Sequence, residues 1–494
     1  MTFVFLPQLT FVLASTLTVP EPEPEPEPDN PSSPTSVVLD KLVAPTPLEP
    51  PSPSPSPSSS LSPSKNKKPV FTPGLQIWTR GQGRINRDLG ADRHSQDIAE
   101  ILLQTRLQAR VAWEPLTAMV QFQDSRVWGF ETSPGSNEAN TDLHQGYLEI
   151  GGSSGAKYSG WIRLGRQEIR YGNQRLLGAP GWSLTAQSFD ALRMHGEYGK
   201  FSVDLLGAIV KPMGIVTQEI PDPTDPDQSI TEDARSTGTQ LVGGTATGRF
   251  HEAVSVELTM LGQRESGQEG FIHFDRRIGN LGARVFGKPA KGLRYDVELN
   301  YQWGKNNRRD HSAWAAAATV AYVHGNKGWK PGAHVTYAIA SGDDGCTFTE
   351  SDITNCKSRE FFNFYPTNHM HYGLVDLLGW RNMRDLELGA ELAFNTVLKI
   401  KADYHFLQLH ESEGRWSNTG GHTIGNAIQD NKNNNLGHEL DLALVIKPWK
   451  PLTIKPGYGV FMADDAAKKM ANADDNADAL KAHHFVYLWI VAAF

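Results

Sequence analysis

The chain has 494 residues, of which 39% are hydrophobic and 21% charged, and its formal net charge at pH 7 is -8. It contains no run of about 18 apolar residues, the length that a spanning helix needs, which argues against a helical membrane protein. Its basic residues are spread among the acidic ones, which argues against a nucleic-acid partner. A membrane barrel is compatible with this composition, because a barrel strand needs only about 10 residues with every second one apolar.

The first 70 residues differ in composition from the rest of the chain. Residues 1–18 begin MTFVFLPQLTFVLAST, an apolar core of signal-peptide length, and are expected to be an export signal, although no Lys or Arg precedes the core. Residues 19–70 include PEPEPEPEP and PSPSPSPSSSLSPS. Proline at this density removes backbone donors and favours polyproline II, so a disordered spacer is predicted, with an SH3-type ligand as the alternative.

From residue 71 onward the dominant period is two. In the segment 293–303, LRYDVELNYQW, one parity carries Tyr295, Val297 and Leu299 while the other carries Arg294, Asp296 and Glu298. The same alternation occurs in QTRLQARVAW (104–113) and DLELGAELAFN (385–395). Alternation of this kind predicts β-strands with one apolar and one polar face.

The connections between these segments alternate between tight links and longer polar loops, which is typical of an up-and-down membrane barrel with short periplasmic turns. About eighteen strands are predicted, at 74–86, 100–113, 117–127, 142–151, 159–168, 188–197, 200–210, 239–250, 253–262, 272–286, 293–304, 312–324, 328–340, 384–395, 397–411, 437–447, 452–462 and 483–494. The segment 368–380, NHMHYGLVDLLGW, would make the count odd. We therefore assign it to the long loop 341–383, which is expected to reach over or into the extracellular mouth.

The last segment, HHFVYLWIVAAF, ends in an aromatic residue, Phe494, preceded by alternating apolar residues. This ending resembles the signal by which outer-membrane barrels are recognised for assembly. The predicted fold is therefore all-β: residues 71–494 form a transmembrane, antiparallel, up-and-down barrel, preceded by the disordered proline-rich segment.

Strand parity also sends many charged side chains toward the inside of this barrel. The expected lumen cations are Arg80, Arg84, Arg106, Arg110, Arg163, Arg193, Arg284, Arg294, Lys399, Lys401 and Lys455. The expected lumen acids are Asp204, Glu257, Asp296, Glu298, Glu387, Glu391, Asp403, Glu439 and Asp441. Guanidinium groups suit the carboxylates of a polyuronate, because their fork binds a carboxylate in a bidentate manner. The alternative for any single residue is an ion pair that braces the barrel wall.

The stretch GRQEIRYGNQRLLGAPGW (165–182) lies where a strand becomes a loop, which is expected to be extracellular. It resembles a motif of the alginate export family, close to G-R-Q, then Y-G-[DN]-Q-R-L-[LV]-G, a Trp and S-F-D. The matching residues are Gly165, Arg166, Gln167, Tyr171, Gly172, Asn173, Gln174, Arg175, Leu176, Leu177, Gly178, Trp182, Ser188, Phe189 and Asp190. Parity leaves the direction of Arg166 open, since Ile162 and Leu164 on the same face point to lipid.

Three further segments are similar to the family: SGD (341–343), FYPTNHMHYGLVD (364–376) with Asn382 after it, and LGHELD (436–441). The resemblance covers about 71–494. It implies an eighteen-stranded outer-membrane barrel that exports an acidic polysaccharide.

Signals for other chemistry are weak. GGSSG (151–155) satisfies G-x-S-x-G, but it is expected in a turn, whereas a nucleophile elbow joins a strand to a helix. The histidines lack metal-ligand spacing, so no metal site and no cofactor are predicted. Asp343, Asp344, Glu350 and Asp352 offer Ca²⁺ ligands in a loop, but a solvated acidic loop is favoured. Cys346 and Cys356 are compatible with one loop disulfide or with two reduced thiols.

The leading hypothesis is a channel in the outer membrane of a Gram-negative-type bacterium. It would serve export or diffusion of an alginate-like polyuronate, or a related anionic solute, through an Arg-rich lumen. Its expected partners are outer-membrane lipid, the anionic solute and a periplasmic synthesis or export machinery, with the protein itself a monomer. The alternatives are a barrel enzyme, such as a lipid hydrolase or protease, and an adhesin.

Overall fold

The computed structural model describes residues 68–87, 97–129, 140–154, 158–211, 214–222, 225–236, 238–269, 272–307, 309–325, 328–343, 356–428, 431–471 and 481–494. The predicted export signal and the predicted spacer up to residue 67 lie outside these residues. No helix of the described part of the chain is long and apolar enough to cross a membrane.

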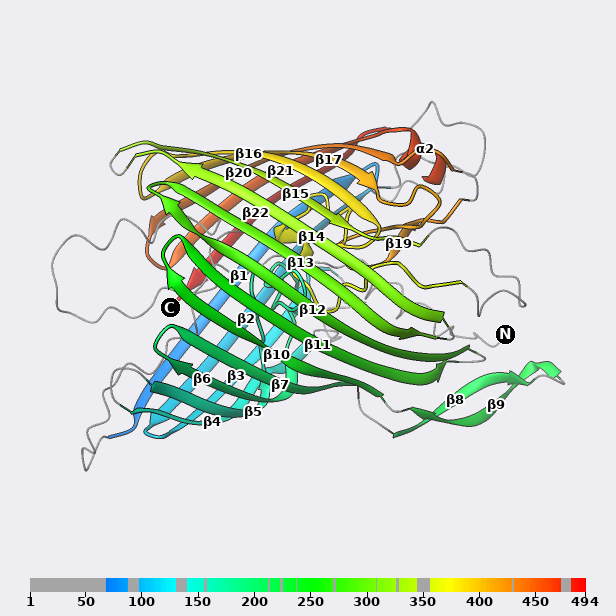
Figure 1. Ribbon diagram of the computed structural model, residues 1–494, viewed down its shortest axis with the longest axis horizontal. Helices are drawn as coiled ribbons and strands as arrows, with labels where there is room; N and C mark the ends of the chain where they lie inside the picture. The colour runs from blue at the N-terminus through cyan, green and yellow to red at the C-terminus, as the bar shows by residue number, and fades with distance from the viewer. Residues whose placement is uncertain are drawn as a thin grey trace.

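Eighteen antiparallel strands form one closed barrel (Figure 1). Each strand pairs with its neighbour along the chain, and β1 pairs with β22 to close the wall. The strands are β1 (Val70–Ile85), β2 (Ile98–Trp113), β3 (Leu116–Val127), β4 (Asn140–Ser154), β5 (Tyr158–Gln167), β6 (Phe189–Tyr198), β7 (Phe201–Lys211), β10 (Gly238–His251), β11 (Val254–Glu269), β12 (Ile272–Ala290), β13 (Leu293–Asn306), β14 (Arg309–Val323), β15 (Lys330–Ala340), β16 (Met383–Ala393), β17 (Leu398–Leu409), β20 (Asn435–Trp449), β21 (Leu452–Ala463) and β22 (His483–Ala493). The predicted fold class and strand count are confirmed.

The wall has two chemically different faces, as the alternation predicts. On β2, Leu107 is 59% exposed whereas Arg106 is 5% exposed. Leu75 of β1 and Phe122 of β3 lie in register with Leu107. Apolar side chains therefore form a continuous outer surface that suits lipid, and the polar side chains line the interior.

Short links join the strands at the end of the barrel where the C-terminus lies (Figure 1). At the other end, two of the predicted long loops are wrong. The strands β11 and β12 are separated only by 270–271, and β13 and β14 only by 307–308. The added strand residues include Arg264, Glu265 and Lys305, and the short stretches that contain them lack the apolar alternation that predicts a strand.

Smaller elements occur in the remaining loops. The hairpin of β8 (Gly214–Asp222) and β9 (Asp225–Ser236) projects away from the barrel (Figure 1). The described residues also contain the hairpin of β18 (Trp416–Ser417) and β19 (Thr423–Gly425), the short helix α2 (Asp465–Ala471) and the 3-10 turn η2 (Asn368–Met370). The segment 368–380 contains this turn and no strand, in agreement with its assignment to a loop.

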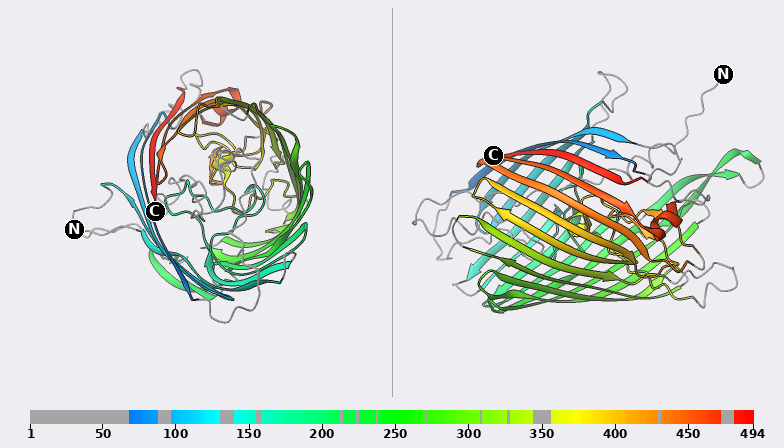
Figure 2. Two further views of the ribbon diagram at one scale, coloured as in Figure 1. Left: turned by 90° about the vertical axis from the view of Figure 1, so that its left-hand side faces the viewer. Right: turned by 90° about the horizontal axis from the view of Figure 1, so that it is seen from above.

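Three connections from the long-loop end turn into the barrel. The view along the barrel shows the cyan-green β5–β6 connection and the yellow β15–β16 connection inside the ring of strands (Figure 2). The β17–β20 connection packs against the second of these through Trp416 and Leu377. We call the residues 168–188, 356–382 and 410–428 together the plug.

Candidate functional site: the lumen and its plug

The first two plug segments are joined by main-chain hydrogen bonds. Leu177 and Tyr365 form a parallel bridge, in which the amide of Gly178 donates to the Tyr365 carbonyl at 2.8 Å and the amide of Tyr365 donates to the Leu176 carbonyl at 2.9 Å. The amide of Thr367 donates to the Gln174 carbonyl at 3.0 Å. A side chain on Gly178 would collide with Thr367, so the motif glycine permits this close approach.

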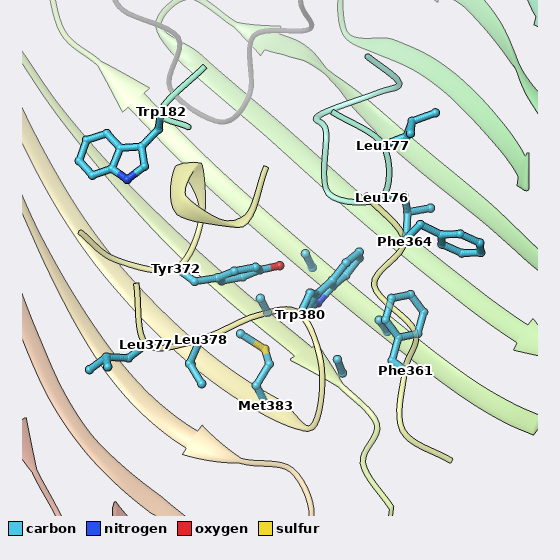
Figure 3. Close-up of a cluster of buried hydrophobic side chains, with 14 of the residues drawn as sticks. Leu176, Leu177, Trp182, Phe361, Phe364, Tyr372, Leu377, Leu378, Trp380 and Met383 are labelled. Atoms are coloured by element: carbon cyan, nitrogen blue, oxygen red, sulfur yellow. The ribbon is translucent and has the colours of Figure 1, made fainter. Parts of the chain in front are cut away.

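An apolar cluster fills the space between the segments (Figure 3). Leu177, Phe361, Tyr372 and Trp380 are each fully buried, and Phe361 and Trp380 meet edge to face with ring centroids 5.3 Å apart. A core of this kind is usual inside a soluble domain. Its position within the barrel means that the plug is a packed unit and not a loose loop.

The third segment closes the plug from the β17–β20 side. The indole nitrogen of Trp416 donates to the Leu377 carbonyl at 2.8 Å, and the amide of Gly379 donates to the Ser417 carbonyl at 3.1 Å. Glu360 pairs with Arg415 at 2.6 Å and with Arg381 at 3.2 Å. These contacts make the three segments depend on one another.

Tyr171 of the family motif ties the plug to the barrel wall. Its hydroxyl donates to Asp204 of β7 at 2.6 Å, and Arg193 of β6 pairs with the same carboxylate at 2.8 Å. Burial and the nearby Asp204 carboxylate raise the pKa of the Tyr171 phenol, which stays protonated and able to donate. The motif stretch was expected in an extracellular loop; it starts at that end of the barrel and turns inward, with Ile169 and Trp182 buried.

Asp376 is a second anchor between plug and wall. It accepts from Trp182 at 3.4 Å, from His369 at 2.6 Å and from Arg84 of β1 at 3.0 Å. Burial alone would raise the pKa of the Asp376 carboxyl, but His369, Arg84 and Trp182 lower it, so the group is ionised. Similarly, Arg170, His144 and Arg106 overcome burial and hold the pKa of Glu168 well below its usual range.

Most of the predicted lumen cations are paired. The pairs are Arg84 with Asp376 at 3.0 Å, Arg106 with Glu168 at 3.4 Å, Arg163 with Glu149 at 2.5 Å, Arg193 with Asp204 at 2.8 Å, Lys399 with Glu391 at 3.1 Å, and Arg284 with Asp296 at 2.9 Å and with Glu257 at 3.7 Å. For these residues the structure places a bracing partner beside each cation.

The other predicted lumen residues lie on the same inner face. Arg110, Arg294 and Lys401 are half-buried, and the Lys455 ammonium lies 4.4 Å from the centre of the Trp489 ring. Among the acids, Glu298 accepts from Asn300 at 2.9 Å. Two others hold the plug backbone, since Asp441 accepts from the Leu374 amide at 2.9 Å and Glu439 accepts from the Val375 amide at 2.8 Å.

Arg80 of β1 is different from these paired cations. It is fully buried, and none of its guanidinium nitrogens has a hydrogen-bond partner among the residues that the structure describes. Its guanidinium carbon lies 4.7 Å from the centre of the Trp182 ring and 5.9 Å from that of Trp78. Parity predicts that Arg80 faces inward, but not that two tryptophans flank it, because Trp182 comes from a distant loop.

Arg166 points away from the lumen. It pairs with Asp142 at 3.0 Å and with Asp190 at 3.4 Å, and all three side chains are partly exposed. The neighbouring Gly165 has a φ of +128°, which distorts the strand end, yet the outward parity of Ile162 and Leu164 continues to Arg166. By contrast, Gln167 is fully buried and donates to the Ala191 carbonyl at 3.0 Å. The remaining motif residues Gly172, Gln174, Arg175 and Phe189 lie in or beside the plug, where Arg175 donates to Tyr372 at 2.7 Å.

The remaining loop predictions concern acids, cysteines and a turn. Asp343 pairs with Arg309 at 2.9 Å, while Asp344, Glu350, Asp352 and Cys346 lie outside the described residues. Cys356 is in a disulfide, and its pairing with Cys346 stays a prediction. Residues 151–154, expected in a turn, belong to β4, because the β4–β5 pairing continues to Ser154 and Tyr158.

The comparisons with known proteins agree with this architecture. The family model for alginate export matches residues 71–479. No curated protein matches the chain. Among solved structures, OccD3 (OpdP) of Pseudomonas aeruginosa has a TM-score of 0.51 at 11% identity, over 85% of this chain and 91% of that chain. The outer membrane protein OprD of the same organism has a TM-score of 0.51 at 10% identity, over 86% and 93%.

OccK9 (OpdG) of Pseudomonas aeruginosa has a TM-score of 0.50 at 13% identity, over 86% of this chain and 98% of that chain. These identities are low, so the three structures support the barrel fold alone. The family match spans most of the chain and includes the inward-folded motif. The chain therefore belongs to the alginate export family and is an outer-membrane β-barrel channel protein.

Proposed function

We propose that this channel carries an anionic polysaccharide of the polyuronate type, or a related anionic solute, by export or diffusion. The observation that carries the proposal is Arg80, a lumen cation that has no hydrogen-bond acceptor in the described structure. A buried guanidinium without an acceptor is costly, and a carboxylate would satisfy it in a bidentate manner. In the absence of such a carboxylate, a cation–π interaction with the flanking Trp182 partly stabilises the Arg80 guanidinium.

The paired cations suit the same solute in another way. Arg163 and Arg193 already have carboxylate partners, so they would exchange contacts with a passing carboxylate without holding it tightly. Conduction requires that each site bind the solute strongly enough for the solute to enter and weakly enough for it to leave. A lumen in which Arg80 lacks an acceptor among the described residues while Arg163 and Arg193 are paired would meet both conditions.

Access to Arg80 requires that the plug move, because Trp182 covers this side chain. The β5–β6 segment that carries Trp182 also carries the family motif, so the proposal links the motif to control of access. A barrel at this membrane has no energy source of its own. We propose that passage is passive, or driven by a periplasmic synthesis or export machinery, and that the protein is not an enzyme.

Replacing Arg80 tests the proposal. The variant Arg80→Gln should lower anion preference, and it should weaken block by a polyuronate oligosaccharide by about 10- to 100-fold, since a hydrogen bond to a charged group is worth about 1.5–3 kcal/mol. The variant Arg80→Lys should keep most of the anion preference but lose part of the block, because an ammonium cannot bind in a bidentate manner. Reversal potentials across a salt gradient and single-channel block in planar bilayers measure both properties.

The matched control is Arg166→Gln, which removes a motif arginine that faces away from the lumen. It should leave selectivity and block unchanged. If Arg80→Gln keeps the ion selectivity and the block of the parent, the polyuronate proposal loses its main support.

A further inference from the structure

Three side chains on neighbouring strands converge on one point of the inner wall. They are His334 of β15, Glu387 of β16 and Asp403 of β17, and their nearest nitrogen and oxygen atoms all lie within 4.8 Å of one another. We propose that this cluster is a binding site for a divalent transition-metal ion of the Zn²⁺ class. The proposal does not depend on the identity of the transported solute.

The strand register explains why these side chains meet. Gly389 of β16 is directly opposite His334 on one side and Asp403 on the other. A Cβ at Gly389 would collide with both the imidazole of His334 and the carboxylate of Asp403. The missing side chain lets two residues from non-adjacent strands approach each other, with Glu387 two positions along the middle strand.

The distances are those of a site that needs only small shifts to close around an ion. The Nε2 atom of His334 lies 2.8 Å from a carboxylate oxygen of Glu387 and 3.8 Å from one of Asp403. Two ligands that are each about 2.0–2.2 Å from a tetrahedral zinc lie about 3.4 Å apart, which falls between these two distances. Because all three residues stand on barrel strands, the ligands are held by a rigid frame.

One carboxylate oxygen of the cluster lacks a hydrogen-bond partner among the described residues. Glu387 is 7% exposed, and its Oε2 atom has no hydrogen-bond partner in the described part of the chain. Two carboxylates face one imidazole, so the cluster carries excess negative charge. Two cations stand on the neighbouring strand: Lys401, which lies in register with Glu391, and His405, which lies in register with Glu387 and is held by Asp385 at 3.1 Å.

The donor set selects the type of ion. Imidazole suits zinc and its neighbours in the first transition row, whereas a site for Mg²⁺ or Ca²⁺ is normally built from oxygen ligands alone. Three protein ligands leave a position open, as in zinc sites that bind a further small ligand. The Asp403 side chain is 25% exposed toward the lumen, so an ion can enter from the pore. A bound dication would cancel the negative charge that the two carboxylates present to an anionic solute.

Equilibrium dialysis of the purified full-length barrel against Zn²⁺, after treatment with a chelator, tests the site. The parent should retain one Zn²⁺ ion per chain. The variants Asp403→Asn and Glu387→Gln should each bind Zn²⁺ at least 10-fold more weakly than the parent. The matched control is His144→Gln. His144 also lies 2.8 Å from a glutamate, Glu168, but its third neighbour is Arg106 instead of a carboxylate, so its loss should not change zinc retention.

Gly389→Ala provides a second variant that alters no ligand. The added methyl group should push His334 and Asp403 apart and weaken zinc retention by at least 10-fold. The thermal unfolding midpoint of the parent should rise with Zn²⁺, and that of each folded site variant should not. Equal zinc retention by the parent and Asp403→Asn, or no retained ion in the parent, would mean that the cluster is only a histidine–carboxylate ion pair.

Discussion

The hydroxyl of Tyr171 donates a hydrogen bond to the wall carboxylate Asp204, which is also paired with Arg193. Replacing Tyr171 by Phe removes this hydrogen bond and keeps the ring packing. A hydrogen bond to a charged group contributes about 1.5–3 kcal/mol, so local opening of the β5–β6 segment should become about 10- to 100-fold more frequent. Amide hydrogen exchange of Tyr171 and Gly178, whose amides donate to the carbonyls of Leu177 and Tyr365, measures this change.

The control for this change is Tyr301→Phe on the outer face, where the hydroxyl contacts Ser312 at 3.1 Å. It should leave exchange in the plug unaltered. Unchanged exchange at Tyr171 and Gly178 in Tyr171→Phe would show that packing alone fixes the segment.

At the residue scale, the sequence predicts which face of the wall a side chain lies on, but not which residue it contacts. Parity places Arg80, Arg163 and Arg193 on the inner face, and their burial agrees with it. Their partners differ because Arg163 meets a carboxylate on the adjacent strand whereas Arg80 meets Trp182, about a hundred residues away. A period of two carries no information on such long-range contacts. The cluster of His334, Glu387 and Asp403 around Gly389 could not be predicted for the same reason, since strand register brings its side chains together.

The strands themselves follow from alternation, and β2 allows a direct test of this. Leu107 belongs to an outer apolar row with Leu75 and Phe122, whereas Arg110 is half-buried on the inner face. Leu107→Arg places a charge in lipid, which costs roughly 2–4 kcal/mol at the bilayer midplane and less near the interfaces. We expect a lower folded fraction in lipid vesicles and a lower urea midpoint. Arg110→Gln should fold like the parent, and equal folding of Leu107→Arg would contradict the assignment of the outer face.

Strand ends were less predictable than strand cores. The membrane imposes apolar alternation only where a strand crosses lipid. The ends of β11, β13 and β14 at the long-loop side carry charged residues instead, and the sequence pattern assigns them to loops. Glu265 on β11 illustrates this, because it lies beyond the predicted strand end at 262 and pairs with Arg276 of β12 at 3.1 Å. The signal that would have revealed these extensions is complementary charge at paired positions.

At the scale of the whole molecule, the barrel and the plug have different physical origins. The barrel satisfies its backbone by closure between β1 and β22, and its outer surface is stabilised by lipid. The plug satisfies its backbone by bonds between loops and has its own apolar core around Phe361 and Trp380. We therefore expect the barrel to form without the plug. This separation explains why the strand count was predictable while the shape of the lumen was not.

The same separation predicts the effect of removing the β15–β16 part of the plug. Replacing residues 361–380 by a short glycine–serine linker removes Phe361, Tyr372 and Trp380 from the lumen and deprives the β5–β6 segment of its bridge at Leu177. The barrel should still form, because none of these residues belongs to a wall strand, and single-channel conductance should rise well above that of the parent. Deleting the β8–β9 hairpin (214–236) is the matched control, since it projects outside the barrel and its loss should not alter the current (Figure 1). Circular dichroism of both variants establishes that the strands are retained. If the shortened plug and the shortened hairpin conduct like the parent, the ion path lies elsewhere and the inward loops do not control access to the lumen.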